Sequence, residues 1–161
     1  MLNELRKILH EYELITVTEK NYPQLSEIFL TNQDYFLIEY GREVGIDDIW
    51  ALAENRPPNL DPNDKFCVGI WKNGTPIAIL DYLIKAPAEH VAYLSMLIIH
   101  DDYKRQYLGT KFANAFISAA RICGFREVGL GVDDNNQAAF LFWSKVGFVQ
   151  SNDYNALCIM L

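Results

Sequence analysis

The sequence lacks the features that mark membrane, disulfide-rich and nucleic-acid-binding proteins. No run of apolar residues reaches the roughly 18 that a membrane-spanning helix needs, and Met1–Leu14 is too polar for the core of a signal peptide. The three cysteines, Cys67, Cys123 and Cys158, form no CxxC pair and have apolar neighbours, so we expect buried, reduced thiols and no metal. Positive charge is also scarce, because 14 Lys and Arg face 21 Asp and Glu. The net charge of −7 argues against non-specific binding to nucleic acid or membranes, and we expect a cytoplasmic protein.

What is present fits one domain that spans the chain, 1–161. Half of the residues are hydrophobic, which suits a sizeable core that needs no disulfide bond or metal ion. No internal repeat, low-complexity tract or long linker divides the chain. The acidic surface would suit a cationic substrate, but solubility explains it equally well.

The first 64 residues are expected to form short helices and one strand. Hydrophobic periodicity and helix start and stop signals define them. In order, they are a helix Leu2–His10, a strand Leu14–Thr18, a helical stretch that opens at Pro23 and ends at Gly41 or Gly45, a helix Ile46–Glu54 and a proline-rich loop Asn55–Asp64.

Three strands follow. Asn73-Gly74 is a strong hairpin signal between Phe66–Trp71 and Thr75–Ile84. The next strand, Val91–Ile99, is apolar on both faces, which places it at the centre of a sheet. Strict alternation puts Val91, Leu97 and Ile99 on one face and Leu94, Met96 and Ile98 on the other.

The pattern then changes to alternating helices and strands. An apolar stripe from Leu108 to Ile122 predicts a helix of about four turns that Gly124 ends. The remaining elements are a strand Val128–Val132, a helix with an Asp134/Gln137 capping box that ends at Gly147, and two strands, Phe148–Gln150 and Tyr154–Met160, joined by Ser151-Asn152-Asp153. Because Val91–Ile99 and Val128–Val132 are connected through a helix, they should be parallel. The fold class is therefore mixed α/β (α+β) with a largely antiparallel sheet.

The carboxyl ends of that parallel pair are the expected ligand site, since two helices begin there side by side. Lys104–Lys111 holds three of the 14 basic residues of an acidic protein. Free backbone N–H groups, a helix dipole and this positive charge would together bind an anion such as a pyrophosphate. A basic, solvated turn explains the same residues equally well. The segment is neither a P-loop nor a dinucleotide-binding motif.

The second half of the chain resembles the GNAT N-acetyltransferase family. Leu97–Thr110 (LIIHDDYKRQYLGT) is similar to the family's central motif, in which a strand leads into an [Arg/Gln]-x-x-Gly-x-[Gly/Ala] turn and a helix. Asn136–Phe148 (NQAAFLFWSKVGF) has the spacing of the Asn-x-x-Ala…Tyr-x-x-x-Gly-Phe signature. The resemblance covers Phe66 to the C-terminus, whereas the first 65 residues match only in the order of their elements.

This resemblance implies a GNAT-like sheet in which the parallel pair splays to admit the thioester of acetyl-CoA, the cosubstrate. It implies transfer of the acetyl group, by direct attack, to a primary amine of a small molecule or peptide. The strand backbone would pair with the pantetheine arm, and amides of the following turn would wrap the pyrophosphate. The matching residues are Leu97, Ile98, Ile99, Lys104, Arg105, Gln106, Tyr107, Leu108, Gly109, Thr110, Asn136, Ala139 and Trp143. Gly129 and Gly131 would permit close approach of the cosubstrate, or they serve packing under a helix.

Three positions depart from the family pattern. Lys104 replaces the first Arg or Gln, and Tyr107 replaces the first glycine, which predicts weaker cosubstrate binding. Trp143 stands where many members carry a tyrosine that is thought to protonate the leaving thiolate. An indole N–H does not titrate usefully, so Trp143 cannot act as that acid and is expected to pack under the cosubstrate.

No base is evident, because Tyr93 stands where some relatives carry a glutamate. Asp81 is the best remaining candidate, since it falls on an apolar face where burial would raise its pKa. The favoured alternative is an Asp at a bulge or sheet rim that is bonded to backbone. Ser95 and His100 are weaker candidates.

Three functions remain open, and the least favoured of them is a purely structural or interaction domain that binds no CoA. The first is an active N-acetyltransferase. The second is a GNAT-like module that binds CoA or a protein partner without turnover, which Tyr107 and Trp143 motivate. The acceptor would be chosen by the hairpin strands and by the segment from Asn21 to Asn63. In that segment the aromatic residues Tyr35, Phe36, Tyr40 and Trp50 would line a pocket or simply pack. A homodimer is possible by family analogy.

Overall fold

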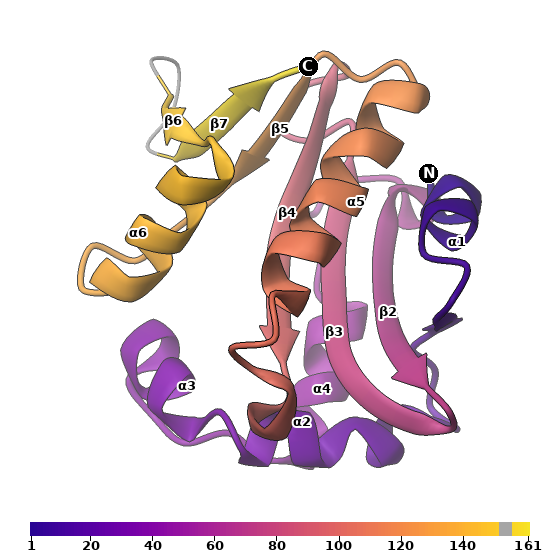
Figure 1. The fold of residues 1–161 in the computed structure, drawn as a ribbon, viewed down its shortest axis with the longest axis vertical. Coiled ribbons are helices and arrows are strands. Elements are labelled where there is room, and N and C mark those ends of the chain that lie inside the picture. Colours follow the sequence, from indigo (N-terminus) through magenta and orange to yellow (C-terminus); the bar gives the residue numbers. More distant parts are fainter. Residues whose placement is uncertain (152–155) are drawn as a thin grey trace.

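The computed structural model describes residues 1–151 and 156–161, and within them seven strands form one mixed sheet (Figure 1). The strand order is β1-β2-β3-β4-β5-β7-β6. The strands are β1 (Glu13–Thr16), β2 (Lys65–Lys72), β3 (Thr75–Ile84), β4 (Val91–Ile99), β5 (Glu127–Leu130), β6 (Val149–Gln150) and β7 (Leu157–Met160). Only β4 and β5 are parallel neighbours among the described strands. The predicted fold class and parallel pair are confirmed.

Helices cover both faces of this sheet (Figure 1). On one face lie α1 (Leu2–Ile8), α5 (Leu108–Ile122) and α6 (Gln137–Val146), and on the other lie α2 (Ser26–Leu30), α3 (Gln33–Tyr40) and α4 (Ile46–Glu54). Three short 3-10 helices, η1 (Tyr22–Leu25), η2 (Pro62–Asp64) and η3 (Asp101–Tyr103), complete the described elements. None of the helices in the described ranges is long and apolar enough to cross a membrane.

Each face of the sheet carries its own apolar core. The larger core packs α5 and α1 on β2–β5, and the predicted stripe of α5 supplies the buried residues Phe112, Ala115, Phe116 and Ala119. The smaller core lies under α2, α3 and α4 and contains Ile28, Phe29, Phe36 and Ile49. The stripe predicted from period-3.6 spacing is therefore confirmed for α5 as far as Ala119, whereas its predicted last member, Ile122, is 61% exposed at the end of the helix.

The helical stretch predicted from Pro23 is broken into η1, α2 and α3, and only its end at Gly41 is confirmed. The break falls at Asn32, whose Nδ2 donates to the carbonyl oxygens of Ile28 at 2.7 Å and Ile99 at 3.0 Å. Asn favours such local bonds over the helical pattern, and here it also joins the α2–α3 corner to the end of β4. As a result Leu37, predicted on the apolar side, is 47% exposed.

The predicted face assignment of the central strand is wrong at Leu94. Asp81 pairs with Met96 but Tyr82 pairs with Leu94, so Ser95 is an extra residue in β4 and forms a β-bulge. The bulge shifts the alternation by one residue. Leu94 therefore joins the α5 side of the sheet, while Met96 and Ile98 join the side of α2–α4.

The N-terminus of α6 and the cysteines also differ from expectation. Asn136 caps α6, and its Oδ1 accepts from the N–H of Ala139 at 3.0 Å, so the predicted Asp134/Gln137 capping box is wrong. Of the thiols predicted to be buried, Cys67 is buried but Cys123 is exposed, because it follows the last turn of α5 at the surface. The predicted connection Asn152-Asp153 and the strand start at Tyr154 lie outside the described residues.

Candidate functional site

A groove of about 750 Å³ opens where the parallel strands separate. β4 and β5 pair only between Val91–Leu94 and Glu127–Leu130 and diverge toward their carboxyl ends (Figure 1). The groove is bounded by the second half of β4, the β4–α5 turn, the end of β5, and one face each of α3 and α6. It therefore reaches from one face of the sheet to the other through the opening between the strands.

Backbone polar groups of β4 face this opening. The N–H of His100 donates to the carbonyl of Ile77 in β3 at 2.9 Å, and alternate residues of an antiparallel ladder share that direction. Leu97 and Ile99 therefore direct their backbone groups away from β3, toward the side where β5 has diverged. The carbonyl of Ile99 already accepts from Asn32, and among the described residues no strand pairs with Leu97 on this side. An extended ligand could add here as a strand does.

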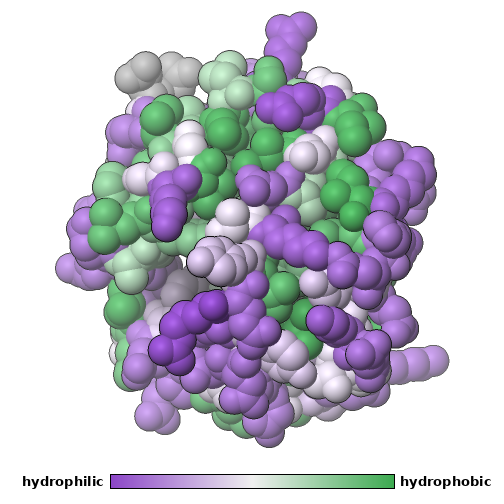
Figure 2. Space-filling view, in the orientation of Figure 1, coloured by the Kyte–Doolittle hydropathy of each residue, from purple (hydrophilic) through white to green (hydrophobic). Residues whose placement is uncertain are grey.

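The turn from β4 to α5 is shaped to bind an anion. Arg105 and Tyr107 both have a φ of 60° (left-handed), and Tyr107 caps α5 without a side-chain hydrogen bond to the first turn. Backbone N–H groups in such alternating conformations converge on one point, and the first amides of a helix have no intrahelical partner. Lys104 and Arg105 add positive charge, and Figure 2 shows hydrophilic side chains gathered over this turn. Helix dipole, amides and cations together favour a diphosphate.

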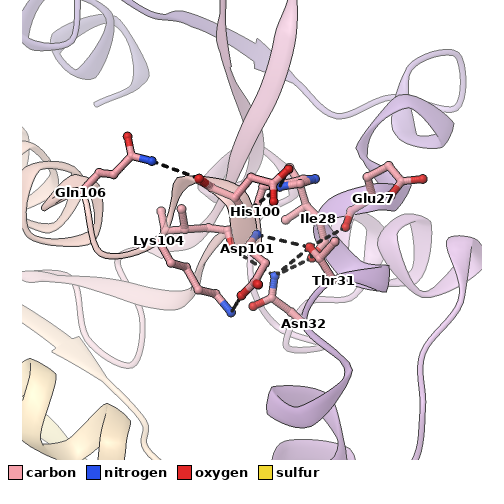
Figure 3. A network of polar contacts seen from close by, with 10 residues as sticks. Glu27, Ile28, Thr31, Asn32, His100, Asp101, Lys104 and Gln106 are labelled. Atoms are coloured by element: carbon pink, nitrogen blue, oxygen red, sulfur yellow. Dashed lines mark hydrogen bonds and ion pairs between the residues drawn. The ribbon is translucent and has the colours of Figure 1, made fainter.

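Contacts with the α2–α3 corner hold this turn in place (Figure 3). The N–H of Asp101 donates to Thr31 Oγ1 at 3.4 Å, and the Asp101 carboxylate pairs with Lys104 Nζ at 3.0 Å. His100 Nδ1 accepts from the N–H of Asp102 at 3.2 Å and so caps η3. The side chain of His100, which the sequence offered as a weak candidate base, therefore serves as the cap of η3 at the start of the turn.

The first turn of α5 touches α6 beside the groove. A Cβ on Gly109 would lie 3.3 Å from the ring of Phe142, so a side chain there would require a small shift of that ring. Trp143 is 8% exposed, lines the groove and packs edge-on against Phe142 and Phe148. Gly131, at the mouth of the opening, leaves room for Tyr93, whose Oη would be 3.0 Å from an added Cβ.

Helix α3 brings carboxylates to the other side of the groove. Asp34 and Glu39 both line it, and Glu39 Oε1 accepts from Asn136 Nδ2 at 3.2 Å. Asn136 is only 5% exposed and also caps α6. One buried amide thus joins α3 to α6 across the groove.

The structure does not bring Asp81 to the groove. Its carboxylate is fully buried on the α2–α4 side, opposite Cys67, and pairs with Lys65, whose Nζ lies 2.6 Å from Oδ2. Burial raises the pKa of the Asp81 carboxyl, and the Lys65 ammonium offsets part of that rise. The predicted burial and pKa direction are confirmed. Of the favoured alternative, the position at a bulge is confirmed, and the bond to backbone is corrected to an ion pair with Lys65.

Most of the other predicted residues do line the groove. They are Leu97, Ile98, Ile99, Lys104, Arg105, Tyr107, Leu108, Gly109, Thr110, Asn136, Ala139 and Trp143, together with the weaker candidate Ser95. Gln106 does not, because its side chain donates to the carbonyl of Asp102 at 3.0 Å. Of the aromatic residues proposed for an acceptor pocket, Tyr35 lines the groove, Phe36 lies in the core and Trp50 packs on Tyr22.

Sequence reasoning missed Asn32 and Glu39. Both lie in or beside α3, in the part of the chain that carries no motif, and both act on partners at least 67 residues away. Only Asn32 had a local signal, since an Asn within an apolar helical pattern is a common helix boundary.

Comparisons with known proteins agree with this architecture. The sequence profile of the Acetyltransferase (GNAT) family matches residues 3–148. The structure is similar to an acetyltransferase from Thermus thermophilus, with a TM-score of 0.74 and 23% identity over 93% of this chain and 97% of that one. It is also similar to the PaiA N-acetyltransferase from Thermoplasma acidophilum in complex with coenzyme A, with a TM-score of 0.64 and 18% identity over 91% and 96%.

A third similar structure is the aminoglycoside acetyltransferase meta-AAC0020 from an uncultured soil metagenomic sample, in complex with sisomicin. Its TM-score is 0.58, with 15% identity over 91% of this chain and 93% of that one. No curated protein sequence matches this chain significantly. At these identities the structural neighbours establish a shared fold, and the family profile covers nearly all of the chain.

Proposed function

This chain belongs to the GNAT acetyltransferase family, and from that premise we propose that it transfers the acetyl group of acetyl-CoA to a primary amine of a small molecule or peptide. The observation that carries the proposal is the groove between diverging parallel strands, lined by an amide-rich basic turn and by carboxylates of α3. A similar protein has coenzyme A bound, which supports the choice of cosubstrate.

The residues present fit acetyl-CoA. The amides of the β4–α5 turn, with Lys104 and Arg105, would hold the diphosphate, and the backbone of Leu97 would pair with the pantetheine arm. Trp143 would pack beside that arm in the role predicted for it. Acetyl-CoA supplies an activated acyl group, and the groove would align it with an amine.

Direct attack makes few chemical demands on the protein. A bond forms between the amine nitrogen and the acyl carbon, the bond to sulfur breaks, the nitrogen loses a proton and the thiolate gains one. A strand N–H that faces the opening would stabilise the oxyanion. Because Trp143 cannot donate a proton from a titrating group, water would protonate the thiolate.

We expect purified protein to release free thiol from acetyl-CoA in the presence of a primary amine. A panel of small amines and of peptides with free α- or ε-amino groups should include acceptors that raise thiol release above the rate without acceptor, with product mass increased by one acetyl group. Saturable acetyl-CoA binding with no turnover on any acceptor would favour the non-catalytic binding module that Tyr107 and Trp143 motivate. Absence of binding to CoA and to acetyl-CoA would contradict both functions.

The left-handed conformation at position 107 gives a finer prediction. Tyr107→Val should raise the Kd for acetyl-CoA about 10-fold, because a β-branched residue resists a φ of 60° and would populate the binding-competent turn less. Tyr107→Gly, which adopts this conformation freely, should keep the Kd within about 3-fold of the parent value. Calorimetric titration measures both. Equal losses in the two variants would show that the tyrosine side chain, not the turn geometry, matters.

A further inference from the structure

Glu39 is a groove carboxylate without a cationic partner in the protein. Its one described side-chain contact is the hydrogen bond from Asn136 Nδ2 at 3.2 Å, and no Lys, Arg or His of the described residues forms an ion pair with it. Asn136 is neutral and 5% exposed. Glu39 therefore presents an uncompensated negative charge to a partly enclosed groove.

Two tyrosines of the same helix flank this carboxylate. Burial first, and then the Glu39 charge, raise the pKa of both Tyr35 and Tyr40, so both phenols stay neutral at ordinary pH. Tyr35 lines the groove with Glu39, and both rings pack against Phe36, at 5.1 and 5.6 Å between centroids. A carboxylate beside aromatic rings is a suitable environment for an ammonium group, through charge and cation–π attraction.

The groove is also electrically polarised. Its two basic lining residues, Lys104 and Arg105, lie at the β4–α5 turn, whereas its acidic lining residues on α3 are Asp34 and Glu39. The basic turn suits the diphosphate of the cosubstrate. The carboxylates of α3 are left for the acceptor and select for positive charge.

Glu39 and the reacting centre are held by different elements. The attacking nitrogen must reach the opening that begins after Leu94 and Leu130, whereas Glu39 is bonded to Asn136 at the start of α6. A cation held at Glu39 is therefore assigned as a second charge on the acceptor.

Building on the proposed function, we propose that Glu39 is a specificity-determining residue that binds an ammonium group of a dicationic acceptor, a diamine or polyamine, whose other amino group is acetylated. On binding, this ammonium takes the place of Asn136 Nδ2 at the carboxylate. The sequence and the family membership do not identify the acceptor molecule. The position of Glu39 assigns to it a second positive charge.

The test compares two acceptors of equal length, 1,5-diaminopentane and 5-amino-1-pentanol, which differ in the second charge. Parent protein should favour the diamine in kcat/KM by at least about 10-fold. Glu39→Gln keeps an oxygen that accepts from Asn136 but removes the charge. It should lower kcat/KM for the diamine by about 10- to 100-fold, as expected for a hydrogen bond to a charged group. For the amino alcohol the change should stay within about 3-fold.

Glu43→Gln is the matched control, because Glu43 is an exposed acid outside the groove. It should leave both acceptors unchanged. The inference is overturned if the parent protein treats the two acceptors alike, if Glu39→Gln lowers both equally, or if Glu43→Gln has the same effect as Glu39→Gln.

A binding measurement separates this inference from the proposed function. If no acceptor is acetylated, the proposed function fails, and calorimetric titration of the diamine into CoA-loaded protein still decides the role of Glu39. Diamine binding that weakens at least about 10-fold in Glu39→Gln supports the inference, and equal binding or none in the parent protein overturns it.

Discussion

Thr110→Asp is expected to raise the Kd for acetyl-CoA by about 100-fold or more while the protein stays folded. Thr110 lies in the first turn of α5 and lines the groove at the end assigned to the diphosphate. Two like unit charges about 4 Å apart repel by about 4 kcal/mol at an effective dielectric constant near 20. Screening by salt reduces this, and about 2.7 kcal/mol corresponds to the expected 100-fold loss.

The control is Thr110→Asn, which has nearly the same shape without the charge and should stay within about 5-fold of the parent Kd. Thr110→Asp should melt at the same temperature or slightly higher, because a carboxylate in the first turn of a helix is stabilising by about 0.3–1 kcal/mol. Calorimetry at two salt concentrations measures the loss, which should shrink at high salt. If Asp and Asn bind acetyl-CoA equally, this turn does not hold the diphosphate.

Lys65→Met is expected to lower the free energy of unfolding by about 3–5 kcal/mol at neutral pH. The Lys65 side chain is 7% exposed and Asp81 is fully buried, so removal of the ammonium leaves a buried carboxylate without its ionic partner. Lys72→Met, at an exposed lysine of the same strand, should change stability by less than about 0.5 kcal/mol. Chemical denaturation measures all variants.

The cost of Lys65→Met should depend on pH with a defined sign. Lys65 lowers the pKa of Asp81, so its loss should raise the folded-state pKa further above that of the unfolded chain. The folded protein then binds more protons than the unfolded one between these two values, and stability falls as the pH rises through the folded pKa. Lys65→Met should therefore be more stable at pH 5 than at pH 8, relative to the parent.

Replacing both charges, as in Lys65→Met with Asp81→Leu, should recover most of the lost stability, since a buried pair often contributes little beyond its apolar replacement. A double variant as unstable as Lys65→Met would show that the loss of stability comes from altered side-chain shape and not from the unpaired charge. Loss of acetyl transfer in a stable double variant would revive Asp81 as a functional residue.

Local patterns predicted the parts of this protein that depend on neighbours in sequence. Asn73-Gly74 sets a hairpin because a two-residue turn needs residues that tolerate positive φ, and both have it here. The stripe of α5 and the two-sided apolar run of β4 follow from periods of 3.6 and 2. The helix–strand crossover then fixes the parallel pair, and with it the place of the turn proposed to bind an anion.

Other features arise only from contacts between distant segments. The sequence pattern of β4 does not show the bulge at Ser95, because a regular alternation of faces assumes that each residue pairs with one residue of β3. Only the pairing of β4 with β3 shows that Ser95 is an additional, unpaired residue. Lys65 and Asp81 lie 16 residues apart and meet because the β2–β3 register places them on one face. No local propensity encodes such pairings.

The sequence by itself determined the fold class through periodicity, and its motifs, through the family resemblance, located the strands that diverge and the turn proposed to bind an anion. The tertiary structure alone decided which charges face the groove. In the folded chain Asp81 is buried in an ion pair with Lys65, and Glu39 is hydrogen-bonded to Asn136, which is 97 residues away in sequence. The β2–β3 register sets the first contact and the packing of α3 beside α6 sets the second, and neither is encoded by local sequence.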